Sequence, residues 1–196
     1  MRLITLRYLV VGMVLAVAAC ANNNPPSSAL PPMSFANKPP IMLNVARIEF
    51  VSEFAPPSGG PHIELQIPVA PENAIRRWVQ DRIQPRGTNG VLRVVIRNAS
   101  ATETTMPRDP NATVFNDQPQ TKVDMADDVA LQVLDERQFV TAEVTAQASR
   151  GETLFTDLKL NERDQILYDM VATLTNALGD QLSARVVTTF HNQILF

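Results

Sequence analysis

The sequence contains one cysteine and two histidines, and this scarcity restricts the chemistry open to the protein. The single cysteine, Cys20, excludes a disulfide framework within the chain. Too few cysteines and histidines are present for a zinc site built from these ligands. Glycine-rich phosphate loops, the zinc-protease motif and the serine-hydrolase elbow are also missing from the sequence. We therefore expect no metal, no cofactor and no catalytic residue.

A strong charge of either sign is missing as well. The 196 residues are 45% hydrophobic and 19% charged, which is typical of a globular chain with one folded domain. The formal net charge is −3, and removal of Arg2 and Arg7 with a signal segment leaves 15 basic against 20 acidic residues, a net charge of about −5. Nucleic-acid-binding proteins carry a basic footprint that this chain lacks. We expect no nucleic-acid partner.

The first 20 residues carry the most specific pattern in the chain. Arg2 and Arg7 precede an apolar run of 12 residues from Tyr8 to Ala19. Such a run is too short to cross the hydrocarbon layer of a membrane, about 30 Å thick, as a permanent helix. A positive start, a short apolar run and small residues at its end are typical of a signal peptide. We assign it to residues 1–19.

The end of this segment resembles the lipobox of bacterial lipoproteins. Val17, Ala18 and Ala19 stand directly before Cys20, in the positions that the signal peptidase of this family recognises. The resemblance implies cleavage before Cys20, acylation of that cysteine and an anchor in the membrane with several acyl chains. Ala21 is not the aspartate that favours retention in the inner membrane, so we expect the periplasmic face of the outer membrane. The alternative is an ordinary secretory signal followed by an incidental cysteine.

Residues 20–40 have the composition of a tether. Six prolines and three consecutive asparagines exclude a helix and leave little apolar material to bury. At about 3.1 Å per residue for polyproline II, this segment reaches roughly 60 Å from the membrane at most. We place one folded periplasmic domain at residues 41–196.

Hydrophobic periodicity divides that domain into strands and helices. Strands are expected over 43–54, 63–67, 91–100, 129–134 and 139–148. One helix is expected to begin at Pro71 and to be ended by Pro85 and Gly87, and a second is expected from Asn161 to Phe190. In the first helix Trp78 is expected to be a core anchor. In the second, Asp164 is expected to complete a capping box, and Gly179 to bend the helix or let it approach the sheet closely. The order predicts an α+β fold, an antiparallel sheet of about four to five strands with two helices on one face, the C-terminal helix being long.

This layout resembles small envelope lipoproteins of the lipopolysaccharide-assembly type and the auxiliary lipoproteins of ABC-type lipid transporters. The segments that carry the likeness are Ala74–Gly87, Gly90–Thr102, Thr145–Arg150, and Asn161–Asp164 with the helix that follows. The resemblance implies a non-enzymatic lipoprotein that binds a protein partner in envelope assembly or transport.

Residues Met106–Ala126 are expected to form a long irregular loop between two strands. Loops longer than about 12–15 residues are usually either functional or disordered. Val114 and Phe115, between prolines of this loop, are the candidate partner-binding residues. The alternative is an insertion without a role. The sequence leaves the oligomeric state open.

Two further functions stay open at this point. One is a periplasmic hydrolase that uses a pair of carboxylates, and the other is a lipid carrier with a cavity between sheet and helices. His62 is expected to be a solvated loop residue, and His191 a favourable charge near the end of the last helix. The carboxylates considered for the hydrolase form two clusters along the chain: Asp124, Asp127 and Asp128, and Asp157, Glu162 and Asp164.

Overall fold

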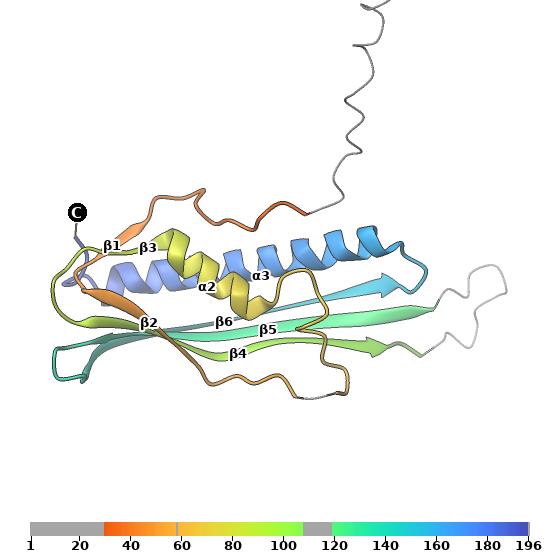
Figure 1. Cartoon of the computed structure of the whole chain (residues 1–196), viewed down its shortest axis with the longest axis horizontal. Coiled ribbons are helices and arrows are strands. Elements are labelled where there is room, and N and C mark those ends of the chain that lie inside the picture. Colours follow the sequence, from red (N-terminus) through yellow and green to blue (C-terminus); the bar gives the residue numbers. More distant parts are fainter. Residues whose placement is uncertain (1–29, 58, 108–118, 196) are drawn as a thin grey trace, which may run out of the picture.

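The structure, a computed structural model, describes residues 30–57, 59–107 and 119–195. Along these described residues, two strands, a helix, four strands and a further helix follow one another (Figure 1). They are β1 (Ile41–Leu43), β2 (Arg47–Ser52), α2 (Pro71–Arg82), β3 (Ile83–Pro85), β4 (Val91–Thr105), β5 (Gln120–Leu134), β6 (Val140–Phe155) and α3 (Leu160–Thr189). This arrangement confirms the predicted α+β class and the long C-terminal helix, which has 30 residues.

The main sheet has four strands in the order β2-β4-β5-β6. The β4–β5 and β5–β6 pairs are antiparallel, as a meander requires. β2 runs parallel to β4. In the sequence, α2 lies between these two strands and returns the chain to the end of the sheet where β2 began. The sheet is therefore mixed, and the prediction of purely antiparallel pairing was wrong for this one pair. A second parallel pair, β1–β3, lies beside the main sheet.

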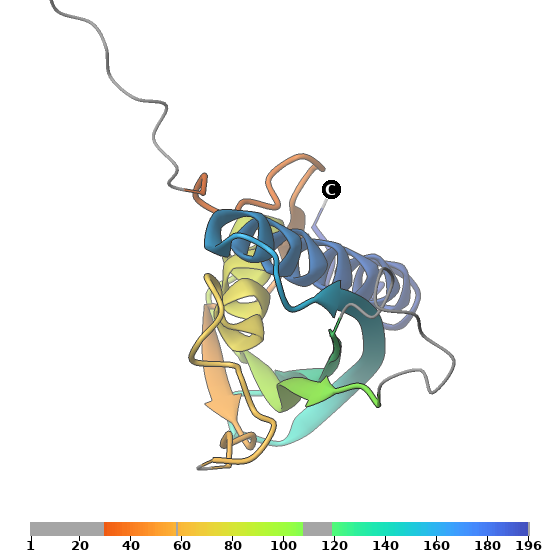
Figure 2. The same cartoon turned by 90° about the vertical axis from the view of Figure 1, so that its right-hand side faces the viewer.

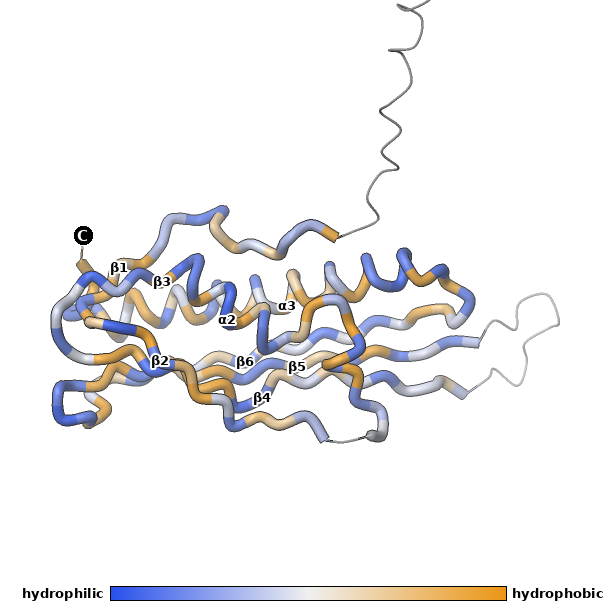
Figure 3. Tube along the Cα trace, viewed as in Figure 1, coloured by the Kyte–Doolittle hydropathy of each residue, from blue (hydrophilic) through white to orange (hydrophobic). Residues whose placement is uncertain are grey.

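Both helices cover the same face of the sheet, which curves around them (Figure 2). α3 packs on β6 and β5, whereas α2 packs on β4 and against α3. Apolar residues recur every three or four positions along α3, where orange segments alternate with blue and white ones in the tube of Figure 3. The side chains of this apolar stripe are buried. They are Leu167, Met170, Val171, Leu174, Leu178, Leu182, Val186 and, just beyond the helix, Phe190.

Gly179 lets the two helices approach each other closely. A Cβ atom at this position would lie 2.0 Å from Nε1 of Trp78, which is on α2. The Trp78 side chain is 3% exposed, so its predicted role as a core anchor is confirmed. The close approach that Gly179 allows is to α2 rather than to the sheet.

All five predicted strands differ in extent from the observed structure. Residues 43–54 are divided between the last residue of β1 and the strand β2, with a break at residues 44–46, where the chain passes from the small sheet to the main one. Residues 63–67 form a turn instead of a strand. β4, β5 and β6 are each 15 or 16 residues long, so residues 120–126 belong to β5 and the expected loop is shorter than 106–126.

Both helix boundaries also shift slightly. α2 ends at Arg82, and the chain continues directly into β3 instead of reaching Pro85 as a helix. α3 begins after Lys159, and no side chain caps its first turn, so the predicted capping box with Asp164 was wrong. Packing of the long apolar stripe against the sheet is the main stabilisation of this helix.

The packed part of the chain begins before Ile41. Met33 and Phe35 are 9% and 1% exposed, and both belong to the hydrophobic core. The Phe35 amide donates a hydrogen bond to Asp81 of α2 over 2.8 Å, and Lys38 forms an ion pair with Asp180 of α3. Residues 30–40 therefore lie on the helix layer (Figure 1), although their proline-rich composition is typical of a free tether. Among the described residues, no helix is long and apolar enough to cross a membrane.

Candidate functional site

The residues with the most specific sequence signal lie outside the described part of the chain. This holds for the signal-peptidase residues and the lipidation site, Val17, Ala18, Ala19 and Cys20, and for the candidate loop residues Val114 and Phe115. The described structure instead brings together polar groups in four other places. These are the core face of β5, the free edge of β4, the uncovered face of the sheet and a cavity at one end of the molecule.

The three aspartates of the first carboxylate cluster do not converge. They lie on β5, where successive side chains point to opposite faces of the sheet. Asp124 and Asp128 are partly exposed and bind Lys122 and Gln147 over 2.9 and 2.8 Å. Asp127 points the other way, toward the helices, and is buried.

The second carboxylate cluster surrounds the start of α3. Asp157 and Glu162 are exposed, and Glu162 lies 3.9 Å from Lys159 in a solvated ion pair. Negative groups are favourable beside the first turn of a helix. In the described ranges, no group of three or more histidine, cysteine, aspartate or glutamate side chains is arranged to hold a metal ion.

Asp127 is a carboxylate in the apolar core. It is 2% exposed, and neither of its oxygens has a hydrogen-bond partner among the described residues. Its cross-strand neighbours are Ala99 on β4 and Ala148 on β6. Burial raises the pKa of Asp127 to about 7, because the charged form loses its hydration and gains no partner.

A second buried carboxylate, Glu64, lies in the turn before α2. It is 4% exposed, and its Oε1 atom is 2.9 Å from Nδ1 of His62. The backbone amide of Ala101 on β4 donates to the same oxygen over 3.0 Å. Burial raises the pKa of Glu64, but the hydrogen bonds from His62 and from the backbone amides of Ala101 and Glu64, with the charge interaction with His62, together outweigh it, so the pKa lies below its ordinary value.

The turn with His62 and Glu64 closes the free edge of β4. β2 pairs with β4 only as far as Ile96. Beyond that point the Ile63 amide donates to the Ala101 carbonyl, and the Glu103 amide donates to the Pro61 carbonyl, over 2.9 and 2.7 Å. The interpretation of His62 as a solvated loop residue was therefore wrong.

We expect Glu64→Gln to lower the free energy of unfolding by about 1–3 kcal/mol at pH 7, because an amide replaces a charged, buried acceptor. A carboxyl group whose pKa falls on folding stabilises the protein above its ordinary value of 4.5, and this contribution is lost as the pH drops through the folded pKa. The variant should therefore lose less stability than the parent as the pH falls below 4.5. Urea unfolding at several pH values measures this, and parallel profiles would contradict it.

The face of β4, β5 and β6 opposite the helices, here called the open face, carries rows of small and polar side chains. Paired residues of the three strands form each row. The rows are Asn98, Asp128 and Gln147; Ser100, Ala126 and Ser149; and Thr102, Asp124 and Gly151. Two open depressions of about 330 and 300 Å³ lie along these rows, and they share Ala126 and Ser149.

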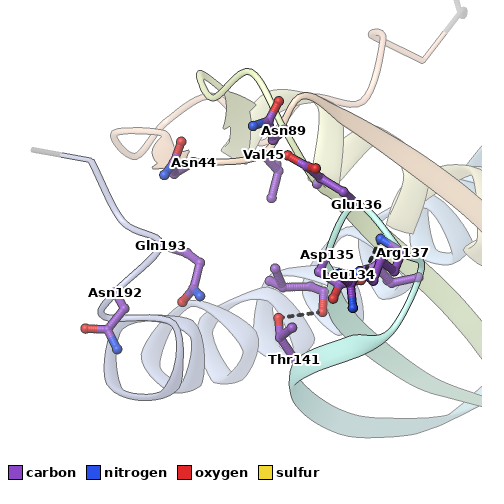
Figure 4. Close-up of a pocket in the computed structure, with 12 residues that line it drawn as sticks. Asn44, Val45, Asn89, Leu134, Asp135, Glu136, Arg137, Thr141, Asn192 and Gln193 are labelled. Atoms are coloured by element: carbon purple, nitrogen blue, oxygen red, sulfur yellow. Dashed lines mark hydrogen bonds between the residues drawn. The ribbon is translucent and has the colours of Figure 1, made fainter.

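A third cavity, larger than these two depressions, lies at the end of the molecule where the β5–β6 turn meets the carboxyl-terminal segment. Its volume is about 460 Å³. Figure 4 shows Asn44 and Asn89 on one side of it, Asn192 and Gln193 on a second, and the turn of β5 and β6 on a third. Most of the residues that line it are polar, and Val45, Val133 and Leu134 are its apolar members.

Sequence reasoning missed Glu64, the buried position of Asp127 and the end cavity. Glu64 occupies a polar position in an apparent strand pattern, and nothing in its neighbours distinguishes it. Asp127 falls among other aspartates, which favoured a solvated cluster. The cavity residues come from four separate parts of the chain, and only the fold brings them together.

No protein-family model and no curated protein matches the chain. Among solved structures, it is similar to a minor lipoprotein from Acinetobacter baumannii, with 10% identity and a TM-score of 0.37 over 74% of this chain and 92% of that one. It is also similar to uncharacterized lipoprotein B from Nitrosomonas europaea, with 14% identity and a TM-score of 0.39 over 74% and 87% of the two chains. Both likenesses are too weak to carry a conclusion about this chain.

Proposed function

We propose that the protein is a bacterial lipoprotein, anchored through acylated Cys20 on the periplasmic face of the outer membrane. In this proposal it catalyses no reaction and binds a protein partner in envelope assembly or transport. The pattern from Val17 to Cys20 supports the anchor. The open face of the sheet is the observation that carries the binding role.

The open face suits a partner for two physical reasons. Its three rows of small and polar side chains present polar side-chain groups over a continuous surface with two shallow depressions. It also lies opposite the helix layer, on which residues 30–40 pack (Figure 1). The segment that leads to the anchor therefore does not cover it.

The two competing functions have less support. A hydrolase needs two carboxylates that face one substrate, but Glu64 is engaged by His62 and Ala101, and Asp127 is buried between the cross-strand neighbours Ala99 and Ala148. A lipid carrier needs an apolar space between sheet and helices. The three cavities described above lie instead on the open face and at the end of the molecule.

Site-specific photocrosslinking in intact cells tests the proposed surface. We expect a photoreactive residue at Ser149, on the open face, to give a discrete crosslinked product with an envelope protein. The same residue at Thr173 is a matched control, since Thr173 is also exposed but lies on α3. A product at Thr173 and none at Ser149 would move the binding surface to the helix layer and contradict the proposal.

We expect Cys20→Ser to leave the folded domain intact and to abolish acylation and stable membrane association. A serine cannot form the thioether, and the core begins at Met33, well after the substituted position. Metabolic labelling with an alkynyl fatty acid, followed by membrane fractionation, measures both effects. Label that persists on the serine variant would refute acylation of Cys20. The photocrosslinking experiment tests the partner-binding surface independently of this result.

A further inference from the structure

We propose that the cavity at the end of the molecule binds a sugar ring of an uncharged glycan. The cavity of about 460 Å³ falls in the range of small-ligand sites. It lies away from the rows of the open face, so this inference is independent of the proposed partner surface.

Four side-chain amides contribute to the cavity wall. Asn44, Asn89, Asn192 and Gln193 come from three separate segments, and Figure 4 shows them around the same space. Within the described residues, none of these four amides makes a side-chain hydrogen bond. Each amide group both donates and accepts. Four such groups around one space match a ligand whose own groups also do both, and sugar hydroxyls have this property.

Backbone hydrogen bonds hold the amide-bearing segments together. The Asn44 amide donates to the Gln193 carbonyl over 2.7 Å, and the Ala46 amide lies 3.1 Å from the carbonyls of Asn89 and Gly90. The three segments are therefore joined to one another before any ligand arrives. A site whose groups are already in place loses less conformational entropy on binding.

The charged groups in the wall disfavour an ionic ligand. Asp135 is engaged by the amides of Arg137 and Phe139, over 2.9 Å in each case, and these bonds shape the β5–β6 turn. Glu136 and Arg137 of the same turn also line the cavity, and their side chains carry opposite charges. A phosphate would face two carboxylates, and a cation would face the guanidinium. An uncharged ligand meets neither penalty.

Three apolar residues, Val45, Val133 and Leu134, also line the cavity. They are 0%, 5% and 0% exposed, so they close the cavity from behind, and a ligand would contact mainly its polar rim. Phe139 follows in the same β5–β6 turn and is 67% exposed, but it does not line the cavity.

Isothermal titration calorimetry of the purified full-length lipoprotein tests the proposal. The protein is kept in a detergent without a sugar head group. The probes are an oligomer of N-acetylglucosamine, which represents a cell-wall glycan, a neutral hexose oligomer, which represents the sugar part of a glycolipid, and inorganic phosphate. We expect binding of at least one of the two oligosaccharides and none of phosphate. The oligosaccharide that binds identifies the source.

Paired substitutions locate the binding. The double substitution Asn89→Ala and Asn192→Ala should lower the affinity for the oligosaccharide by about tenfold or more, because two hydrogen bonds to the ligand are lost. Asn161→Ala removes an exposed amide outside the cavity and should leave the affinity unchanged. The melting temperatures of all three proteins should agree. Failure of both oligosaccharides to bind, preferential binding of phosphate, or an unchanged affinity in the double variant would each overturn the proposal.

Discussion

Leu174→Asp is expected to abolish cooperative unfolding of the domain or to lower its melting temperature by roughly 10 °C or more. The Leu174 side chain is 2% exposed and lies in the middle of the apolar stripe that packs on the sheet. An unpaired carboxylate at this position would lose its hydration without gaining a partner, at a cost of several kcal/mol. That is a large share of the stability of an ordinary domain. Circular dichroism during heating of the purified variant measures the loss.

The neighbouring residue provides the control for this substitution. Thr173 is exposed on the same turn of α3, so Thr173→Asp should change the free energy of unfolding by no more than about 0.5 kcal/mol. Equal destabilisation by the two variants would mean that helix propensity, and not burial against the sheet, controls the stability of α3.

Asp127→Asn is expected to stabilise the protein strongly at pH 8 and very little at pH 4. Folding raises the pKa of Asp127 from 3.8 to about 7, so the folded state holds a proton that the unfolded state releases between these values. The stability of the parent protein therefore falls as the pH rises from 4 to 7, and the loss approaches roughly 4 kcal/mol above pH 7. Asparagine has nearly the same shape and carries no charge. Its own buried amide reduces the gain somewhat.

Urea unfolding of both proteins across this pH range measures the difference. The free energy of unfolding of the variant should change less with pH than that of the parent. Asp128→Asn is the matched control, because Asp128 lies on the opposite face of β5 and binds Gln147. Its effect on the pH profile should be small. If Asp127→Asn reproduces the parent profile instead, the carboxyl group has access to water or a partner in the folded protein.

Local periodicity was enough to predict the helices and the general class of the fold. The stripe from Leu167 to Phe190 repeats over several turns, and a pattern of that length is hard to form by chance. The first half of β5 could not be predicted in the same way, since Asp124, Asp127 and Asp128 have the composition of a loop. Pairing with two long neighbouring strands outweighs their low strand propensity.

The candidate sites divide by how far apart their residues lie in the sequence. The anchor motif is contiguous and can be read directly. Glu64 obtains its role only because β2 ends early and leaves the amide of Ala101 without a strand partner. The parallel pairing of β2 with β4 also depends on where α2 returns the chain. Such relations are set by tertiary structure, and one sequence does not contain them as a local pattern.

The edges of the main sheet determine how another chain can attach to it. Gln181 and Arg185 of α3 reach over β6 and donate to the carbonyls of Gln147 and Thr145. The turn with Glu64 occupies β4 beyond the end of β2, and β2 itself has only six residues, among them Arg47 and Glu49. Short, charged or covered edges discourage strand addition and edge-to-edge aggregation. A partner is therefore expected to bind side chains on the face of this sheet and not to pair with the sheet as an additional strand.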